Sequence, residues 1–252
     1  MRRVTLLAAI LIVALFAVGL PAGTVAQGSV LSGKTICLDP GHGGSDPGAV
    51  YGALHEADIN LDVAYGLQAL LKTDGAVVVM TRTDDSSKSN YDRYTFCNKE
   101  QATILVSIHT NSVSDPTRDG SLALYFKKVD VPLAQAIYDV MWPYLRDRAP
   151  SPANFTGFGL TNYASGVLLK SDMPAAMMEP LFMSNPVEAQ WLQQSIYDDA
   201  EGSTLSKGCA GFNCRRGQIA QAIYNGILNY FAQSGDGGGG SACGSPPCRK
   251  GK

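Results

Sequence analysis

Two histidines and two glutamates stand where a folded chain could gather them into one reactive site. His42 and His109 each come just after a short apolar segment that predicts a β-strand. Because the carboxyl ends of strands in an open α/β sheet border a common crevice, both imidazoles are expected to face it. Glu56 begins a predicted helix that reaches the same crevice, and Glu179 ends a further predicted strand.

These residue types predict zinc-dependent hydrolysis. Two imidazoles and one carboxylate form a known set of three protein ligands for catalytic zinc, which leaves the fourth position for water. The metal lowers the pKa of that water toward 7, and a separate carboxylate then carries its proton to the leaving nitrogen. His42, Glu56 and His109 are the candidate ligands, and Glu179 is the candidate proton carrier. The same ligands also accept other divalent metals, and each residue taken singly fits a loop, capping or ion-pairing role.

An alternation of strands and helices is expected to position these side chains. Short apolar runs predict strands, and apolar residues at helical spacing predict helices. The expected strands are 34–38, 77–81, 104–108 and 175–178. The expected helices are one with its apolar pattern from Ile59, which stops before Gly75, and 91–101, 133–145 and 219–231. Residues 111–178 would hold one further strand, one of these helices and a Gly-rich return over 155–166. This order favours an α/β layer fold with a largely parallel or mixed sheet.

Length and composition narrow the class of protein. The 252 residues allow one sizeable α/β domain, or two small ones. The hydrophobic and charged fractions, 45% and 17%, are ordinary for a globular protein. A formal net charge of -2 gives no support for a nucleic-acid partner, which would require a basic face.

The two ends of the chain differ from the rest. A positive start, an apolar run over 4–20 and a small-residue site ending at Ala26 predict a signal peptide over 1–26. Its removal would leave the protein in a secreted, periplasmic or cell-wall space without stable membrane insertion. An uncleaved anchor is the alternative, although the apolar run is slightly short for a span. Gly, Ser and Pro predict a flexible tail over 233–252, so the catalytic domain is expected over 33–232.

The six cysteines favour disulfides if the chain is exported. Cys37 and Cys97 stand in apolar segments and are interpreted as buried free thiols. The other four lie in Gly-rich or Pro-rich surroundings and are expected to pair with near neighbours, Cys209 with Cys214 and Cys243 with Cys248. A cysteine zinc cluster is the alternative, but no C-x-x-C pair occurs.

Five stretches of the sequence carry motifs in an order typical of one enzyme family. They are residues 39–49, 56–61, 81–84, 107–111 (preceded by Arg93 and Asn98), and 173–174 with 179–185. The first reads DPGHGGSDPGA, the fourth SIHTN, and the last ends in EPLFMSN. Together they resemble the zinc-dependent N-acetylmuramoyl-L-alanine amidases over most of the chain.

The resemblance implies roles for the four residues. His42, Glu56 and His109 would bind zinc, and Glu179 would be the catalytic carboxylate. The fold would be α/β, a single domain whose central, mostly parallel sheet has helices on both faces. The substrate would be peptidoglycan, cut at the amide between N-acetylmuramic acid and L-alanine. Two rivals stay open: another zinc hydrolase of the cell wall, such as a peptidase, and a wall-binding or scaffold protein without turnover.

Some positions depart from the family pattern or fall between its motifs. Leu181 replaces the usual glycine, and is expected to narrow the cleft or shift Glu179. His55, beside Glu56, is interpreted as a partly exposed residue at a helix start. Residues 199–214 are expected to form an extra surface loop. The span 111–178 leaves no surplus segment to cover the cleft, so an open site that needs no protein activator is expected.

Overall fold

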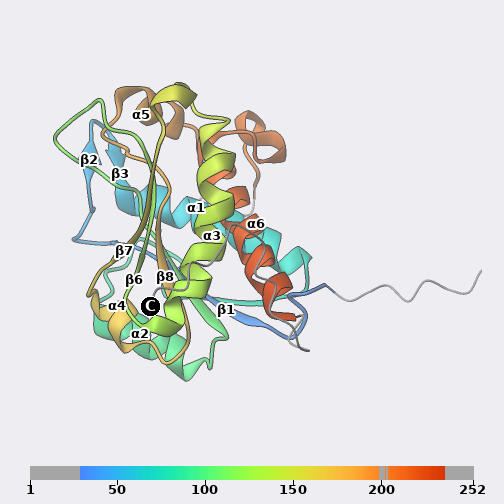
Figure 1. Ribbon diagram of the computed structural model, residues 1–252. Coiled ribbons are helices and arrows are strands. Elements are labelled where there is room, and N and C mark those ends of the chain that lie inside the picture. The colour runs from blue at the N-terminus through green and yellow to red at the C-terminus, as the bar shows by residue number, and fades with distance from the viewer. Residues whose placement is uncertain (1–28, 199–201, 203, 236–252) are drawn as a thin grey trace, which may run out of the picture.

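A six-stranded sheet forms the centre of the protein in the computed structural model, which describes residues 29–198, 202 and 204–235 (Figure 1). Its strands are β1 (Thr35–Pro40), β4 (Val77–Met80), β5 (Ile104–Ile108), β6 (Gly120–Tyr125), β7 (Thr156–Asn162) and β8 (Ala175–Glu179). Their order is β4-β1-β5-β8-β6-β7. Only β6 and β8 pair antiparallel, which confirms the mixed, mostly parallel sheet. A separate hairpin joins β2 (Val50–Tyr51) to β3 (Leu54–His55).

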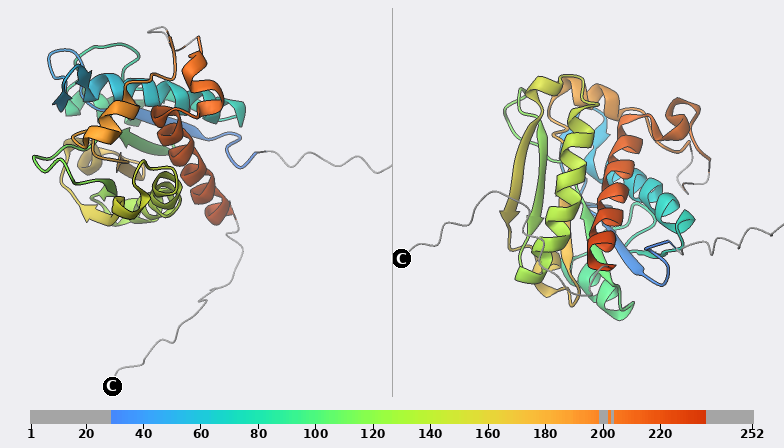
Figure 2. Two further views of the ribbon diagram at one scale, coloured as in Figure 1. Left: turned by 90° about the horizontal axis from the view of Figure 1, so that it is seen from above. Right: turned by 45° about the vertical axis from the view of Figure 1, so that its right-hand side comes forward.

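Helices cover both faces of the sheet. One face carries α1 (Glu56–Thr73), α3 (Val131–Arg146) and α6 (Arg215–Gly235), with α3 and α6 lying side by side (Figure 2). The other carries α2 (Asn90–Lys99) and α4 (Gly166–Lys170). The remaining helices are α5 (Pro186–Leu192) and three short 3₁₀ turns, Lys128–Asp130, Pro152–Asn154 and Lys207–Phe212. Among the described residues, no helix is both long and apolar enough to cross a bilayer.

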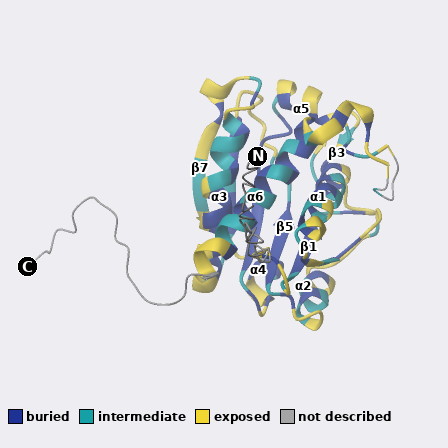
Figure 3. Ribbon diagram, turned by 90° about the vertical axis from the view of Figure 1, so that its right-hand side faces the viewer, coloured by how far each residue is buried: buried dark blue, intermediate teal, exposed yellow. Residues whose placement is uncertain are grey.

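The strands at the centre are buried on both faces (Figure 3). Successive side chains of a strand point to opposite faces, and β5 shows this directly. Ile104, Val106 and Ile108 join the larger core beneath α1, α3 and α6, whereas Leu105 joins the smaller core beneath α2 and α4. Burial on both faces explains why these strands read as continuous apolar runs.

The stretch between β5 and β8 holds one strand more than the sequence predicts. The Gly-rich return is itself a strand, β7, which pairs parallel with β6 at the edge of the sheet. Its side chains are exposed or half-buried, and two of its seven residues, Gly157 and Gly159, have no side chain to bury. An edge strand with so little buried surface lacks the apolar pattern that predicts a strand. At the other end of the chain, α6 continues to Gly235, into the segment predicted as a tail.

The cysteines form two disulfides. Cys209 pairs with Cys214 as predicted, with the two Cα atoms 4.7 Å apart. Both cysteines are buried, although most residues around them in the 204–213 stretch are exposed. The prediction of free thiols at Cys37 and Cys97 is wrong, because these two residues form a disulfide between β1 and α2. An apolar environment suits a thiol and a disulfide equally, so it could not distinguish them. Residues 1–28 and 236–252 lie outside the described residues, so the predicted pair of Cys243 and Cys248 lies outside them as well.

Candidate active site

The loop after β1 presents His42 in a constrained backbone conformation. His42 has a φ of 61°, in the left-handed region that costs energy for a residue with a Cβ. Gly43 follows at a φ of 126°, and a Cβ at that position would lie 2.6 Å from the carbonyl oxygen of Ser86. The loop therefore needs glycine at 43, and outside contacts must hold His42 in place.

Two buried arginines supply those contacts. Arg82 donates from Nε to the carbonyl oxygen of Pro40 at 3.0 Å, and Arg93 donates to the same oxygen at 2.7 Å. Arg93 also donates to the carbonyl oxygen of His42 at 2.7 Å and to Asp39 Oδ1 at 2.8 Å. Burial alone would raise the pKa of Asp39, but the neighbouring Arg93 keeps it below its ordinary value. Both arginines lie in stretches that resemble family motifs, but the sequence indicated no role for them.

Glu56 connects the two histidines. It is the first residue of α1, and its oxygens accept hydrogen bonds from the backbone NH groups of Ala49 at 3.0 Å and Thr110 at 3.1 Å. Oε2 lies 3.2 Å from His42 Nε2, and Oε1 lies 3.0 Å from His109 Nδ1. One ligand atom from each of the three side chains lies within 4.8 Å of the others.

The three side chains fit a divalent cation such as zinc. Their donor set is two imidazole nitrogens and one carboxylate oxygen. His42 Nδ1 lies 2.8 Å from Asp46 Oδ2, so this carboxylate orients the ring and leaves Nε2 facing Glu56. Burial alone would raise the pKa of Glu56, but hydrogen bonds with His109 and His42 hold it below its ordinary value. The hydrogen bond with Glu56 raises the pKa of His42 to about 9, so the Glu56 carboxylate stabilises positive charge on its neighbour.

Glu179 faces the same cavity without joining the cluster. It ends β8, and its Oε2 is shielded from solvent with no hydrogen-bond partner among the described residues. Burial raises the pKa of its carboxyl group to about 7. A shielded carboxylate oxygen without a hydrogen-bond partner at a cavity wall is available to exchange a proton with a bound molecule.

The cavity around these residues has a volume of about 590 Å³. The ends of β5 and β8, the loop after β1, and the start of α2 contribute to its walls. His42, Glu56, His109 and Glu179 all line it, so the structure brings together the four residues that the sequence nominated. His55 lies apart at the N-cap of α1, with 48% of its side chain exposed, as expected for a residue at a helix start.

Leu181 does not line this cavity, contrary to the expectation that it narrows the cleft. Its side chain is fully buried in the larger core. Its side chain therefore fills core volume and does not line the cavity. The departure from the family glycine therefore concerns packing.

Leu181→Ala is expected to lower the free energy of unfolding by about 2–5 kcal/mol, because it leaves a cavity in the core. Chemical denaturation with a circular dichroism readout measures this loss. Leu169→Ala, in α4 and 37% exposed, is the matched control and should change stability by less than about 0.5 kcal/mol. Equal losses from the two variants would contradict the assignment of Leu181 to the core.

The fold and the cluster together define a candidate metal-dependent hydrolase with an α/β domain. The family model for N-acetylmuramoyl-L-alanine amidases matches residues 36–210. The chain therefore belongs to this amidase family.

Individual relatives agree with the family match. The chain is 31% identical to the germination-specific N-acetylmuramoyl-L-alanine amidase of Bacillus subtilis, over 82% of this chain and 83% of that protein. It is 29% identical to the amidase LytC of the same organism, but spans only 36% of its length. Among solved structures, the amidase AmiC2 of Nostoc punctiforme is 28% identical, with a TM-score of 0.65 over 80% of this chain and 99% of that one. The CwlD amidase of Clostridioides difficile, in complex with the GerS lipoprotein, is 27% identical. Its TM-score is 0.59, and the match covers 79% of this chain and 99% of that one.

Proposed function

We propose that this protein hydrolyses the amide bond between N-acetylmuramic acid and L-alanine in peptidoglycan, with zinc held by His42, Glu56 and His109. The observation that carries the proposal is the convergence of these three ligand atoms beside Glu179 in one cavity. Membership of the amidase family supplies the bond and the substrate.

The chain's own residues have distinct tasks in this reaction. A bound zinc ion supplies Lewis acidity and an activated water. Glu179 takes the proton of the attacking water and returns it to the amide nitrogen as that nitrogen leaves. Burial raises the pKa of its carboxyl group, and a carboxylate with a raised pKa accepts a proton more readily than an ordinary one. Asp46 keeps the His42 ring oriented, and the backbone NH groups on Glu56 fix that carboxylate.

The cavity walls suit a substrate rich in hydroxyl, amide and carboxylate groups. Lys88, Asn90 and Ser165 contribute polar side chains at one side. Tyr163, which is half-exposed, contributes an aromatic face of the kind on which a sugar ring can stack. Since peptidoglycan lies outside the cytoplasmic membrane, the proposed action places the protein in the secreted, periplasmic or cell-wall space. The proposed signal peptide over 1–26 and the part of the proposed tail from 236 onward lie outside the described residues, and 33–232 is the proposed catalytic domain.

The rival functions differ from this proposal in specific ways. A scaffold without turnover has no need of Glu179, whose buried Oε2 makes no hydrogen bond within the described chain. A cell-wall peptidase would use the same kind of zinc site, and the products of digestion distinguish it from an amidase.

We also propose that the site is open and needs no protein activator. Neither α3 nor α4, the two α-helices between the His109 and Glu179 motifs, brings a carboxylate to the cavity wall. The side chains of His42 and His109 keep 24% and 17% of their surface exposed. A relative that forms a complex with a lipoprotein makes the partner question worth testing directly.

The purified protein with zinc is therefore expected to solubilise peptidoglycan by itself. Loss of turbidity of a peptidoglycan suspension measures this. Removal of the metal by a chelator should stop the reaction, and added zinc should restore it, because two histidines and one glutamate supply the protein ligands. A zinc-loaded protein that stays inert until a second protein is added would refute the open site. Activity that survives complete metal removal would refute the metal requirement.

A further inference from the structure

We propose that the Cys37–Cys97 disulfide is a positioning element of the metal site. It fixes α2 to β1 and so holds Arg93 against the loop that carries His42. This inference rests on the proposed zinc site, and it names a structural bond on which metal affinity depends. Neither the disulfide nor α2 contributes a metal ligand, so the effect passes through the contacts that Arg93 and the segment before α2 make with the loop.

Helix α2 has few other anchors on the sheet. It is ten residues long, shorter than an isolated helix needs to be stable in water. Only Arg93 and Cys97 are buried. A capping box between Ser89 and Asp92 stabilises its first turn, but this contact lies within the helix and its cap.

The remaining contacts of α2 lead toward α4. Asn98 donates to the carbonyl oxygen of Lys170 at 3.1 Å and accepts from the backbone NH of Asp172 at 3.0 Å. Phe96, half-buried, packs on the smaller core. The position of α2 relative to β1 therefore depends chiefly on the disulfide and on the buried arginine.

The disulfide and the arginine act on the same side of the helix. Arg93 and Cys97 are four residues apart, so their side chains lie on one face of α2. Cys37 stands two residues before Asp39 in β1, and the Cα atoms of Cys37 and Cys97 are 5.8 Å apart. Two links therefore join α2 to β1 and together form a closed ring. One is the Cys37–Cys97 disulfide, and the other is the ion pair between the Arg93 guanidinium and Asp39 Oδ1, at 2.8 Å.

This ring ends on the metal-binding loop. Arg93 donates to the carbonyl oxygen of His42, whose left-handed backbone must be held from outside. The segment between β4 and α2 adds two further contacts to the loop. Ser87 Oγ donates to the carbonyl oxygen of Gly43 at 3.0 Å, and Asp85 Oδ1 accepts from the Gly44 NH at 2.7 Å. Release of α2 from β1 would loosen the end of this segment and with it the placement of His42.

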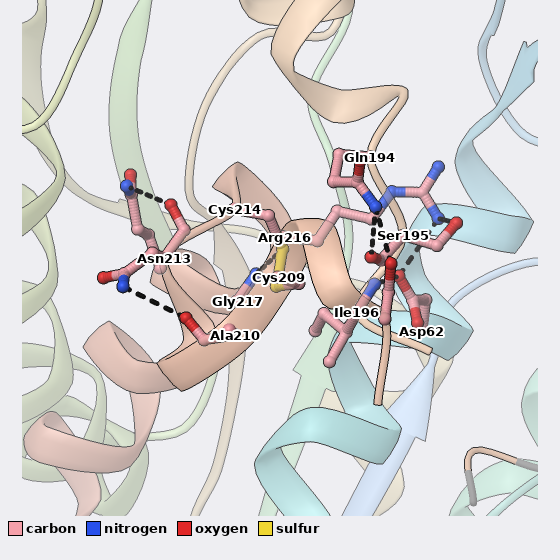
Figure 4. Close-up of a disulfide and its surroundings, with 12 residues drawn as sticks. Asp62, Gln194, Ser195, Ile196, Cys209, Ala210, Asn213, Cys214, Arg216 and Gly217 are labelled. Atoms are coloured by element: carbon pink, nitrogen blue, oxygen red, sulfur yellow. Dashed lines mark hydrogen bonds and ion pairs between the residues drawn. A yellow bond between two sulfur atoms is a disulfide. The ribbon is translucent and has the colours of Figure 1, made fainter. Parts of the chain in front are cut away.

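The second disulfide provides a matched control. Cys209–Cys214 lies near the start of α6, with Asp62, Gln194 and Arg216 in its neighbourhood (Figure 4). None of these residues lines the active-site cavity. Removal of Cys209–Cys214 therefore deletes a buried disulfide, as removal of Cys37–Cys97 does, but at a place away from the metal-binding loop.

The test compares the double variants C37A/C97A and C209A/C214A by zinc dissociation constant, in competition with a chelating indicator, and by circular dichroism. C37A/C97A is expected to bind zinc about 10- to 100-fold more weakly, the range found when groups supporting metal ligands are lost. C209A/C214A should bind within about twofold of wild type, since its bond touches no residue of the cavity. A folded C37A/C97A variant with wild-type zinc affinity would overturn the proposal.

A mutant cycle that combines the loss of the disulfide with Arg93→Lys tests whether the disulfide acts through Arg93. Lysine keeps the charge but cannot reproduce the forked contacts with Asp39 and three carbonyl oxygens, so R93K should also lose zinc affinity. If the disulfide acts through Arg93, the triple variant C37A/C97A/R93K should bind zinc no more weakly than R93K within about twofold. Losses that multiply would show that the disulfide does not act through Arg93, and would overturn this route.

A second measurement applies if C37A/C97A fails to fold. Treatment of C209A/C214A with a water-soluble phosphine during brief partial unfolding, followed by refolding, reduces the buried Cys37–Cys97 bond and the predicted Cys243–Cys248 bond. In each, the two sulfurs gain two electrons and two protons, and one phosphine becomes its oxide with oxygen from water. After removal of the phosphine, the reduced protein should show the same weakening, and unchanged affinity would contradict the proposal. Zinc binding by wild type without peptidoglycan turnover would refute the proposed function but leave this inference standing. A wild-type protein that binds no zinc would refute both.

Discussion

Glu179→Gln is expected to lower the rate of peptidoglycan hydrolysis by about 10²- to 10⁴-fold, the usual contribution of a general acid–base group. Glutamine keeps the size of the side chain but cannot accept the proton of the attacking water. Glu179 lines the cavity with a shielded Oε2 and makes none of the contacts that join His42, Glu56 and His109. Zinc should therefore stay bound to the variant with its affinity unchanged.

Two readouts on the same preparation test this expectation. Metal content is measured on the purified variant, and turnover is measured on a peptidoglycan suspension. Glu100→Gln, an exposed glutamate that follows α2, is the control and should retain both. Loss of zinc from E179Q would make Glu179 a metal ligand, and activity within a few fold of wild type would remove its catalytic role.

His42→Ala and His109→Ala are each expected to weaken zinc binding by more than about 100-fold, beyond the range for groups that only support a ligand. Either change leaves two protein ligands where catalytic zinc sites use three. It also leaves Glu56 without one of the two imidazoles that keep its carboxylate charged.

His55→Ala is the control that the chain itself offers. His55 adjoins Glu56 in sequence, but its exposed ring lies 3.6 Å from Asp58 and takes no part in the cluster. Zinc titration of the three variants should separate His55 from the other two histidines. Comparable metal loss from all three would mean that the wrong pair of histidines has been assigned.

The parts of the site that lie at strand ends could be predicted because the signals are local. The apolar runs that become β1, β5 and β8 are buried on both faces, and the polar residues beyond them mark the crevice. His42, His109 and Glu179 are found by this rule, and Glu56 follows from its place at the start of α1. Parallel pairing of β1 with β5 and of β5 with β8 brings the three strand ends together.

The supports of the site could not be predicted because they depend on contacts between distant residues. Arg93 follows His42 by 51 positions, and an arginine in a polar stretch indicates a solvent-exposed helix face before the fold is known. The Cys37–Cys97 pair spans 60 positions and has no spacing signal. Strand β7 could not be predicted for a different reason. It lies at the exposed edge of the sheet, so its sequence lacks the alternation of apolar and polar residues that indicates a strand.

The most direct test of the central claim is mass identification of the products from purified peptidoglycan digested by the zinc-loaded protein. The expected products are glycan strands that keep N-acetylmuramic acid with its lactyl carboxylate free, together with stem peptides that begin with a free L-alanine amino group. Peptide cross-links and glycosidic bonds should remain intact. New termini within the stem peptides or cross-links, with L-alanine still attached to muramic acid, would contradict the amidase activity and identify a peptidase.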